Sequence, residues 1–374
     1  PNLEYFIYKS IILNNLYGVD IMNEAVEIAK LRLFLKLVAT VEADYRKPNL
    51  GLEPLPDVDF NIRAGNTLVG YATEVELKDA FVGKLDFDND AEKIKEKCDI
   101  VGRAFARYKE IQLQGHADFE DFKTAKDDLN HRLDKLRDEL NLLLHKQHYA
   151  NVKFDQWLAT HQPFHWFAEF YEIVAGKGGF DVTIGNPPYV EYSKVRKNYA
   201  IQNYSTESSG NLYAFAIERA NILLSNIGHF GFIIPISFVC TQRMLAAQDI
   251  ILRNSLNVYL SNYAERPSKL FTGAEVLLTI ILSQKGKGEN CTVFSTGFTK
   301  WGMEERPCLF ERTNYTAVNK LKSFIIPKVS APIETQLLLK IANKPSKLGT
   351  HFQKKSKYVI FYRIGGGRYW KIFT

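Results

Sequence analysis

Cysteine, metal-binding motifs and long apolar runs are scarce in this chain. Its four cysteines (Cys98, Cys240, Cys291 and Cys308) are scattered without a CxxC pair. A structural zinc site or a disulfide framework is therefore not expected, and a reducing, cytoplasmic setting fits. The eight histidines include no HExxH, which gives no support for a zinc hydrolase. No apolar run reaches the roughly 18 residues of a membrane-spanning helix. We expect neither a metal site nor a membrane partner.

The chain also lacks an initiating methionine and a signal-peptide pattern. It begins Pro1-Asn2-Leu3-Glu4, with no basic segment before an apolar core. We therefore expect a piece of a longer protein. Charge of one sign is not in large excess, because 48 Lys and Arg against 42 Asp and Glu give a net charge of +6. That mild excess permits nucleic-acid binding without requiring it.

The most informative stretch runs from residue 180 to residue 189. A β-prone run over 180–184 ends abruptly in Asn186-Pro187-Pro188-Tyr189. The run predicts a buried strand. The two prolines lack N–H groups and hold the residues before them in extended geometry, so they end the strand. We predict a rigid loop at the carboxyl end of a strand, where open α/β sheets bind ligands.

This loop offers the groups needed to activate an aromatic amino group. Such a group is a poor nucleophile because its lone pair is delocalised into the ring. The side-chain oxygen of Asn186 and the carbonyl of Pro187 are candidate acceptors for its two N–H bonds, and Tyr189 is a candidate to stack on the ring. Asn186, Pro187, Pro188 and Tyr189 resemble motif IV of the DNA adenine-N6 methyltransferases. Four letters alone also fit an ordinary proline-terminated loop.

A strand, an acid and a helix follow one another near the N-terminus. Residues 16–21 predict a short buried strand with Asp20 and Ile21 at its tip, and Asn23 is a candidate helix N-cap. The helix carries an amphipathic stripe at i, i+3, i+7 and i+10: Ile28, Leu31, Leu35 and Val38. This order is the second half of a nucleotide-binding βαβ unit, whose acid accepts from ribose hydroxyls. It resembles motif II of the same enzymes, which implies that Asp20 and Ile21 bind S-adenosyl-L-methionine. A surface Asp before a helix is the alternative.

The glycine-rich loop that should precede this strand, motif I of the family, is absent. Nothing in residues 1–16 resembles GxG, so we expect the chain to begin after it and to bind cofactor weakly or not at all by itself. Asn66 follows another short strand, in a Gly-Asn turn, and matches motif III. The resemblance makes Asn66 a candidate contact to the adenine of the cofactor, whereas such turns are also commonly structural.

Residues 85–150 have a different pattern. Apolar residues recur at alternating spacings of three and four in two series: Ile94, Cys98, Val101, Phe105 and Tyr108, then Leu129, Leu133, Leu136, Leu140 and Leu143. Both series fit a heptad seam. We predict an inserted helical hairpin whose interspersed charges form a solvated face rather than a DNA contact.

Further motifs follow in order. The aromatic run at 164–171 is more typical of a core than of a base-stacking platform. Residues 210–220 and 231–238 resemble motifs V and VI. Phe271 matches the motif VIII aromatic that packs on an extruded adenine, with a core role as the alternative. Basic and aromatic residues over 354–371 suit nucleic-acid contact.

The ordered motifs cover about residues 14–284 and resemble γ-type adenine-N6 methyltransferases of Type II restriction–modification systems, including Type IIG fusions with a nuclease. The resemblance implies an α/β fold with a Rossmann-like class I methyltransferase sheet and helices on both faces. Residues 1–284 would form the catalytic domain, with the hairpin inserted at 85–150. Residues 285–374 would be a linker and the beginning of a DNA target-recognition region.

The implied function is site-specific methylation of adenine N6. S-adenosyl-L-methionine would be the donor, and the acceptor would be an adenine extruded from double-stranded DNA. A fused or cognate restriction endonuclease would be a further partner. Two alternatives stay open: an N-methyltransferase acting on RNA or on protein glutamine, and a non-catalytic DNA-binding subunit that keeps the fold.

Overall fold

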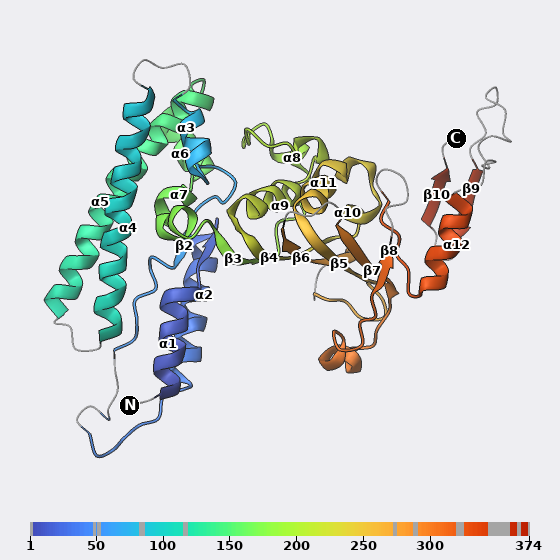
Figure 1. Ribbon diagram of the computed structural model, residues 1–374, viewed down its shortest axis with the longest axis horizontal. Helices are drawn as coiled ribbons and strands as arrows, with labels where there is room; N and C mark the ends of the chain where they lie inside the picture. Colours follow the sequence, from blue (N-terminus) through green and yellow to red (C-terminus); the bar gives the residue numbers. More distant parts are fainter. Residues whose placement is uncertain are drawn as a thin grey trace.

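The computed structural model describes residues 3–47, 50, 54–81, 87–114, 119–271, 275–286, 291–318, 325–342, 360–364 and 368–372. Long helices lie at one end of the molecule, a large sheet with its own helices lies in the middle, and the C-terminal helix and strand pair lie at the other end (Figure 1). The helices are α1 (Leu3–Asn15), α2 (Asn23–Val38), α3 (Glu74–Asp79), α4 (Phe87–Gln114), α5 (Phe119–His148), α6 (Phe154–His161), α7 (Trp166–Glu169), α8 (Tyr192–Val195), α9 (Leu212–Leu223), α10 (Ser237–Cys240), α11 (Leu245–Arg253) and α12 (Pro332–Ala342). The strands are β1 (Gly18–Asp20), β2 (Ile62–Ala64), β3 (Phe180–Gly185), β4 (Leu224–Pro235), β5 (Ser255–Tyr263), β6 (Leu278–Lys285), β7 (Thr292–Thr299), β8 (Thr316–Val318), β9 (Ile360–Ile364) and β10 (Arg368–Ile372).

The larger sheet has six strands in the order β3-β4-β6-β5-β7-β8. β3 is parallel to β4, and β5 is parallel to β7, whereas β6 lies antiparallel between β4 and β5. The sheet is therefore mixed. With the helices that connect its strands, it confirms the predicted α/β class.

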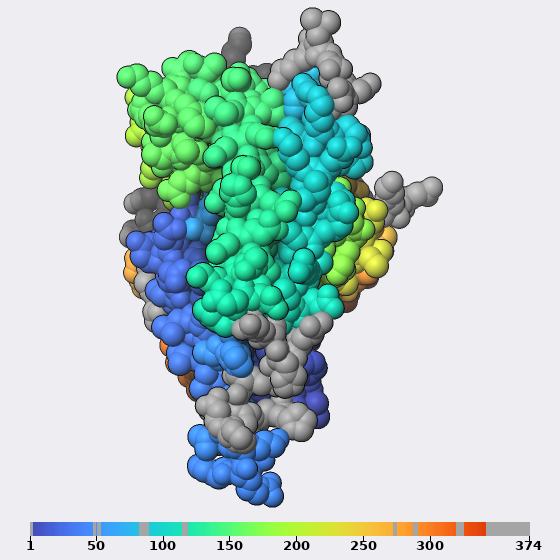
Figure 2. Space-filling model, turned by 90° about the vertical axis from the view of Figure 1, so that its left-hand side faces the viewer, coloured from blue at the N-terminus to red at the C-terminus, as the bar shows by residue number. Residues whose placement is uncertain are grey.

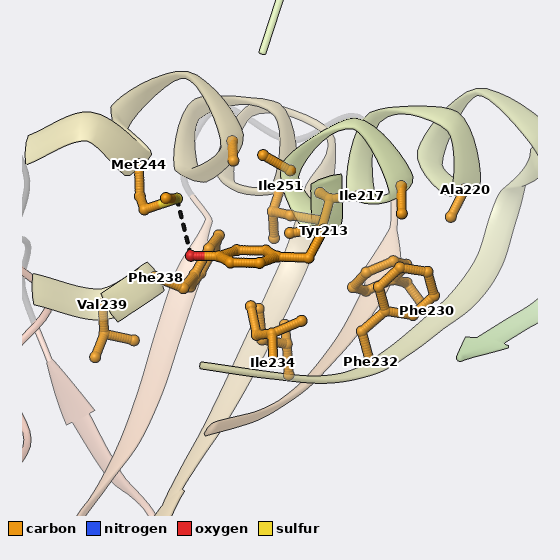
Figure 3. Close-up of a cluster of buried hydrophobic side chains, with 14 of the residues drawn as sticks. Tyr213, Ile217, Ala220, Phe230, Phe232, Ile234, Phe238, Val239, Met244 and Ile251 are labelled. Atoms are coloured by element: carbon orange, nitrogen blue, oxygen red, sulfur yellow. Dashed lines mark hydrogen bonds between the residues drawn. The ribbon is translucent and has the colours of Figure 1, made fainter. Parts of the chain in front are cut away.

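Helices α9 and α11 cover one face of this sheet. Phe230, Phe232 and Ile234 of β4 point into the core beneath α9, because side chains alternate between the two faces of a strand (Figure 3). Tyr213 of α9 is fully buried, and its hydroxyl lies 2.9 Å from Ser237 Oγ and 3.1 Å from Met244 Sδ. This layer fixes α9 and the end of β4 against each other.

The predicted strand at 180–185 is present, but its predicted burial is wrong for one face. Val182 is 57% exposed and Ile184 is 81% exposed. Ile184 lies opposite Gly231, on the face away from Phe230 and Phe232. Within the described residues β3 pairs only with β4. Nothing in that part of the chain covers this apolar flank.

A smaller sheet pairs β1 with β2 in parallel, with Asp20 opposite Ala64. α2 connects the two strands and buries Val26 and Leu37 on its inner side. The apolar stripe predicted on this helix faces the other way: Ile28, Leu31, Leu35 and Val38 are all exposed. The stripe therefore does not form the contact between α2 and this sheet.

Helices α4 and α5 pack along each other within the segment predicted as a hairpin. The heptad residues are buried: Ile94, Cys98, Val101, Phe105, Tyr108, Leu129, Leu133, Leu136 and Leu140. Leu144, rather than the predicted Leu143, is the buried residue that ends the series. Figure 2 shows the pair filling one end of the molecule beside the N-terminal segments.

A buried carboxylate joins this helical pair to the smaller sheet. Glu169 of α7 forms ion pairs with Arg63 of β2 and with Arg137 of α5, the latter at 2.5 Å. The Glu169 side chain is almost completely buried. A buried charge that loses its partner is strongly destabilising, so these pairs tie the three elements together.

The larger sheet continues past residue 284, the predicted end of the catalytic domain. β7 and β8 extend it, and Ile326 and Val329 pack into its core. The division into catalytic and recognition regions stays a prediction. β9 and β10 pair antiparallel and hold residues 360–364 and 368–371 of the basic and aromatic tail. Residues 354–359 and 365–367 of that tail lie outside the described residues. In the described ranges no helix is both long and apolar enough to span a membrane.

Candidate functional site

The two sheets approach each other at β1 and β3. Tyr17, just before β1, makes ring contacts with Phe180 at the start of β3 and with Phe170, at centroid distances of 6.0 and 5.3 Å. Beyond the other ends of the strands, Tyr204 donates to the carbonyl of Leu68 at 2.9 Å. β1 and β2 are parallel, and Tyr17 holds the start of β1 near the start of β3. No described strand lies between β1 and β3.

The loop Asn186–Tyr189 leaves the carboxyl end of β3, as predicted. Pro187 is buried, whereas Asn186 and Pro188 are exposed. The Tyr189 hydroxyl lies 2.6 Å from Asn186 Oδ1 and 2.9 Å from the carbonyl oxygen of Ile233. Burial raises the pKa of Tyr189 to about 12. The hydroxyl therefore stays protonated at working pH and can hold the Asn186 amide oxygen in place.

The chain after this loop is clamped to the start of α9. The Leu212 N–H donates to the carbonyl of Val190 at 2.9 Å, and the Tyr192 N–H donates to that of Gly210 at 3.0 Å. Gly210 has φ +64°, a left-handed conformation that favours glycine, and a Cβ there would lie 2.5 Å from Arg243 Nη2. The sequence contains this glycine, but nothing in its pattern showed that it positions the loop.

Asp20 lies exposed at the carboxyl end of β1, where the sequence places it. Its Oδ1 accepts the N–H of Met22 at 2.8 Å, which orients the carboxylate at the strand tip. Ile21 and Met22 beside it are also exposed. An exposed carboxylate next to apolar side chains suits a ribose next to a flat ring; the role of Asp20 and Ile21 in binding S-adenosyl-L-methionine stays a prediction.

Asn66 has a different environment. It is buried; its Nδ2 donates to the carbonyl of His161 at 2.8 Å, and its Oδ1 accepts from the Leu68 N–H and from the Tyr199 hydroxyl at 2.8 Å. Burial raises the pKa of Tyr199, which keeps this donor protonated. Both lone pairs of its Oδ1 are engaged, so a contact from Asn66 to a cofactor that keeps these bonds would use the second N–H of Nδ2. Sequence reasoning missed Tyr199 because it lies far from Asn66 along the chain.

Phe271 is half-buried in the segment between β5 and β6. β5 ends at Tyr263 and β6 begins at Leu278, and these two residues are paired. Leu278 is also paired with Pro235 at the end of β4. The segment therefore lies at the end of the sheet where the carboxyl ends of β3 and β4 meet, which is also where Asn186 lies.

A polar cavity of about 460 Å³ is lined by α3, α5 and α9 and by the segments 68–71 and 202–204. Arg219 is buried in its wall and donates to Glu76 at 2.9 Å, to the Tyr204 hydroxyl at 2.8 Å and to the Gly70 carbonyl at 3.3 Å. With its donors engaged in this way, Arg219 holds α3 and α9 together.

Comparison with known proteins gives a consistent picture. A Methanocaldococcus jannaschii protein that carries the name of a type II restriction enzyme and methyltransferase, RM.MjaORFECS2P, is 30% identical; the match covers 75% of this chain and 27% of that protein. The Type ISP restriction–modification enzyme LlaGI with a DNA substrate mimic is 14% identical, with 50% of this chain and 22% of that chain covered, at a TM-score of 0.33. The DrdV–DNA complex is 15% identical, with 41% and 18% covered, at 0.32. Likeness at this level adds nothing to the description of the site. The Eco57I restriction-modification methylase family matches residues 14–266, and the chain belongs to that family.

Proposed function

We propose that this chain is part of a site-specific DNA methyltransferase that transfers a methyl group from S-adenosyl-L-methionine to adenine N6. The observation that carries the proposal is the Asn186–Tyr189 loop at the carboxyl end of β3, with the Asn186 amide oxygen fixed by the Tyr189 hydroxyl at 2.6 Å. Membership of a restriction-modification methylase family supports DNA as the substrate.

In this proposal the adenine leaves the duplex, because its N6 is otherwise paired inside the helix; extrusion costs a few kcal/mol. Asn186 Oδ1 and the Pro187 carbonyl accept the two N6–H bonds and direct the nitrogen lone pair outward. Tyr189 and Phe271, on the same edge of the sheet, hold the two faces of the ring. No general base is required once the amino group is polarised and held in near-attack geometry.

The methyl donor would lie beside Asp20 and Ile21, where the exposed carboxylate and apolar side chain fit its nucleoside. Asn66 remains a proposed contact, made through the second N–H of its side-chain amide. We infer that one further parallel strand from outside these 374 residues lies between β1 and β3. This strand would be followed by α1 and then by β1, a connection of the preferred right-handed kind. The glycine-rich loop would lie at its carboxyl end.

The whole protein is larger than this chain if it resembles its relative, since the chain spans about a quarter of the relative's length. We propose a restriction endonuclease, fused or cognate, as its partner, double-stranded DNA as its substrate and the cytoplasm as its location. The division at residue 284 between a catalytic domain and the start of a target-recognition region belongs to the same proposal.

The test uses the full-length protein and counts methyl groups transferred to duplex DNA. Asn186→Ala should lower methylation by about 10²- to 10³-fold, comparable to the loss of one transition-state hydrogen-bonding group in other enzymes, and should keep DNA binding. Asn226→Ala, at another exposed asparagine, is the matched control and should retain activity. Near-normal methylation by Asn186→Ala refutes the assignment. Transfer to RNA or protein but not to DNA supports the alternative enzymes, and no transfer by the wild type supports a non-catalytic subunit.

A further inference from the structure

Helix α2 is apolar on both of its sides. Its inner side, with Val26, Leu33 and Leu37 buried or half-buried, packs on the smaller sheet and α1. Its outer side carries the exposed stripe Ile28 (58%), Leu31 (55%), Leu35 (59%) and Val38 (50%). At about 3.6 residues per turn the stripe lies opposite the inner residues. A helix that is hydrophobic all round is normally buried, so the outer side needs a cover.

The pattern of the stripe indicates what kind of element covers it. Offsets of three, seven and ten residues are those of a heptad seam, which packs against another helix. The exposed charges beside the stripe differ in sign along it: Glu24 lies beside its first half and Arg32 beside its second half. Glu27 is already paired with Lys30, and the Lys36 ammonium lies over the Tyr8 ring. A complementary helix has a basic residue near Glu24 and an acidic residue near Arg32.

The area of the stripe argues for a cover within the same polypeptide. Four half-exposed side chains offer on the order of 200–400 Å², well below the roughly 800 Å² per partner of a stable interface between separate chains. A tethered helix does not need that area because its effective concentration is high. The related M. jannaschii protein is long enough to supply one, since this chain spans 27% of it.

We propose that the outer side of α2 docks an amphipathic helix from the remainder of the same polypeptide. This contact is separate from the strand inferred between β1 and β3, because the stripe faces away from both sheets. It does not depend on the methyl-transfer chemistry. It makes α2 the attachment point between the catalytic fold and another part of the full-length protein.

The first test compares two lysine substitutions in the full-length protein. Leu35→Lys introduces a charge into the seam and should lower the thermal midpoint by about 1–3 °C, the shift expected for one or two kcal/mol at about 2.1 cal/mol/K per residue in a unit of this size. Val75→Lys is the matched control at a residue of α3 that is 67% exposed and should shift the midpoint by less than about 1 °C. Equal, small shifts overturn the proposal.

The second test needs no charge in the seam and holds even if Leu35→Lys fails to fold. Leu35→Cys and Val75→Cys are labelled with a maleimide in the native full-length protein, and each site is quantified by peptide mass spectrometry. We expect labelling at position 35 to be at least about tenfold slower at both high and low protein concentration. Equal rates overturn the proposal. Protection that disappears on dilution also overturns it, because it assigns the cover to a second copy of the chain.

Discussion

Replacing Tyr189 with phenylalanine separates two roles that the proposed site gives to one residue. The ring is a candidate to stack on the target base, and the hydroxyl lies 2.6 Å from Asn186 Oδ1 and 2.9 Å from the Ile233 carbonyl. The hydroxyl has one proton, so we assign the shorter bond as the donated one. Tyr189→Phe keeps the ring and removes only the group that fixes the Asn186 amide.

The magnitude follows from the bond that is lost. Ile233 lies within the ladder between β4 and β6, so its backbone keeps partners in the variant, and Asn186 is exposed enough to gain water. The loss is therefore that of one ordinary hydrogen bond, about 0.5–1.5 kcal/mol. It corresponds to about a 2- to 13-fold fall in kcat/KM. Tyr189→Leu also removes base stacking, which costs about a further 1–3 kcal/mol. Its kcat/KM should therefore lie about 5- to 150-fold below that of Tyr189→Phe.

The assay is methyl transfer to a duplex oligonucleotide by the full-length protein, measured for the wild type and both variants between pH 6.5 and 9. Because burial raises the pKa of Tyr189 to about 12, the wild-type hydroxyl stays protonated over this range. The ratio of wild type to Tyr189→Phe should therefore be constant with pH. Binding of DNA with an abasic site opposite the target should be unchanged in Tyr189→Phe.

Three results would refute this reasoning. A loss beyond about 100-fold in Tyr189→Phe would mean that the hydroxyl takes part in the chemistry. Equal rates for the Phe and Leu variants would mean that the ring does not contact the base. A ratio that changes with pH would mean that the hydroxyl titrates in the working range.

Other buried or constrained groups give predictions for the full-length protein, each measured by urea unfolding. Glu169→Gln leaves the nearly buried Arg63 without its carboxylate, while Arg137 keeps Asp134 at 2.6 Å. It should cost about 3–5 kcal/mol, whereas Glu139→Gln, in an exposed pair, should cost less than about 1 kcal/mol. Equal costs would contradict the burial argument. Gly210→Ala puts a Cβ 2.5 Å from Arg243 at φ +64°. We expect the free energy of unfolding to fall by about 1–3 kcal/mol and methylation to fall with it. An unchanged urea midpoint would count against the contact that Gly210 makes between the acceptor loop and α9. Burial lowers the pKa of His165 to about 3, so below about pH 6.5 the unfolded chain binds a proton on this histidine that the folded chain does not. The free energy of unfolding should therefore fall by about 1.4 kcal/mol per pH unit as the pH drops from there. Equal urea midpoints at about pH 7 and 5.5 would contradict this linkage.

The apolar periodicity predicted α4 and α5 well because each of the two helices buries its apolar face against the other. Leu129, Leu133 and Leu136 are buried against α4, which the same segment supplies. The stripe on α2 has an equally regular pattern and is exposed. A pattern shows that a face needs a cover, but it does not show where the cover comes from.

The candidate site was predictable where it depends on local chain geometry. A strand ended by two prolines places Asn186 at a sheet edge, and the order of motifs adds Asp20 at another strand tip. The bonding of Asn66 was not predictable, because its partners His161 and Tyr199 are 95 and 133 residues away. Only folding brings these segments together, and no local signal distinguishes a buried Gly-Asn turn from one that contacts a ligand.

The strand proposed between β1 and β3 would pair the edge of β3 that has no described partner, whereas the exposed face that carries Val182 and Ile184 would need a layer packed on it. The sequence of β3 is apolar enough for a central strand, yet Val182 and Ile184 are exposed and its outer edge has no described partner. β1 also has one edge without a described partner, and Tyr17 and Phe180 hold the starts of the two strands together. A parallel strand between them would pair both edges. Under the proposed function, the loop at its carboxyl end would reach the strand ends that carry Asp20 and Asn186, and the methyl donor would lie between the acid and the acceptor loop.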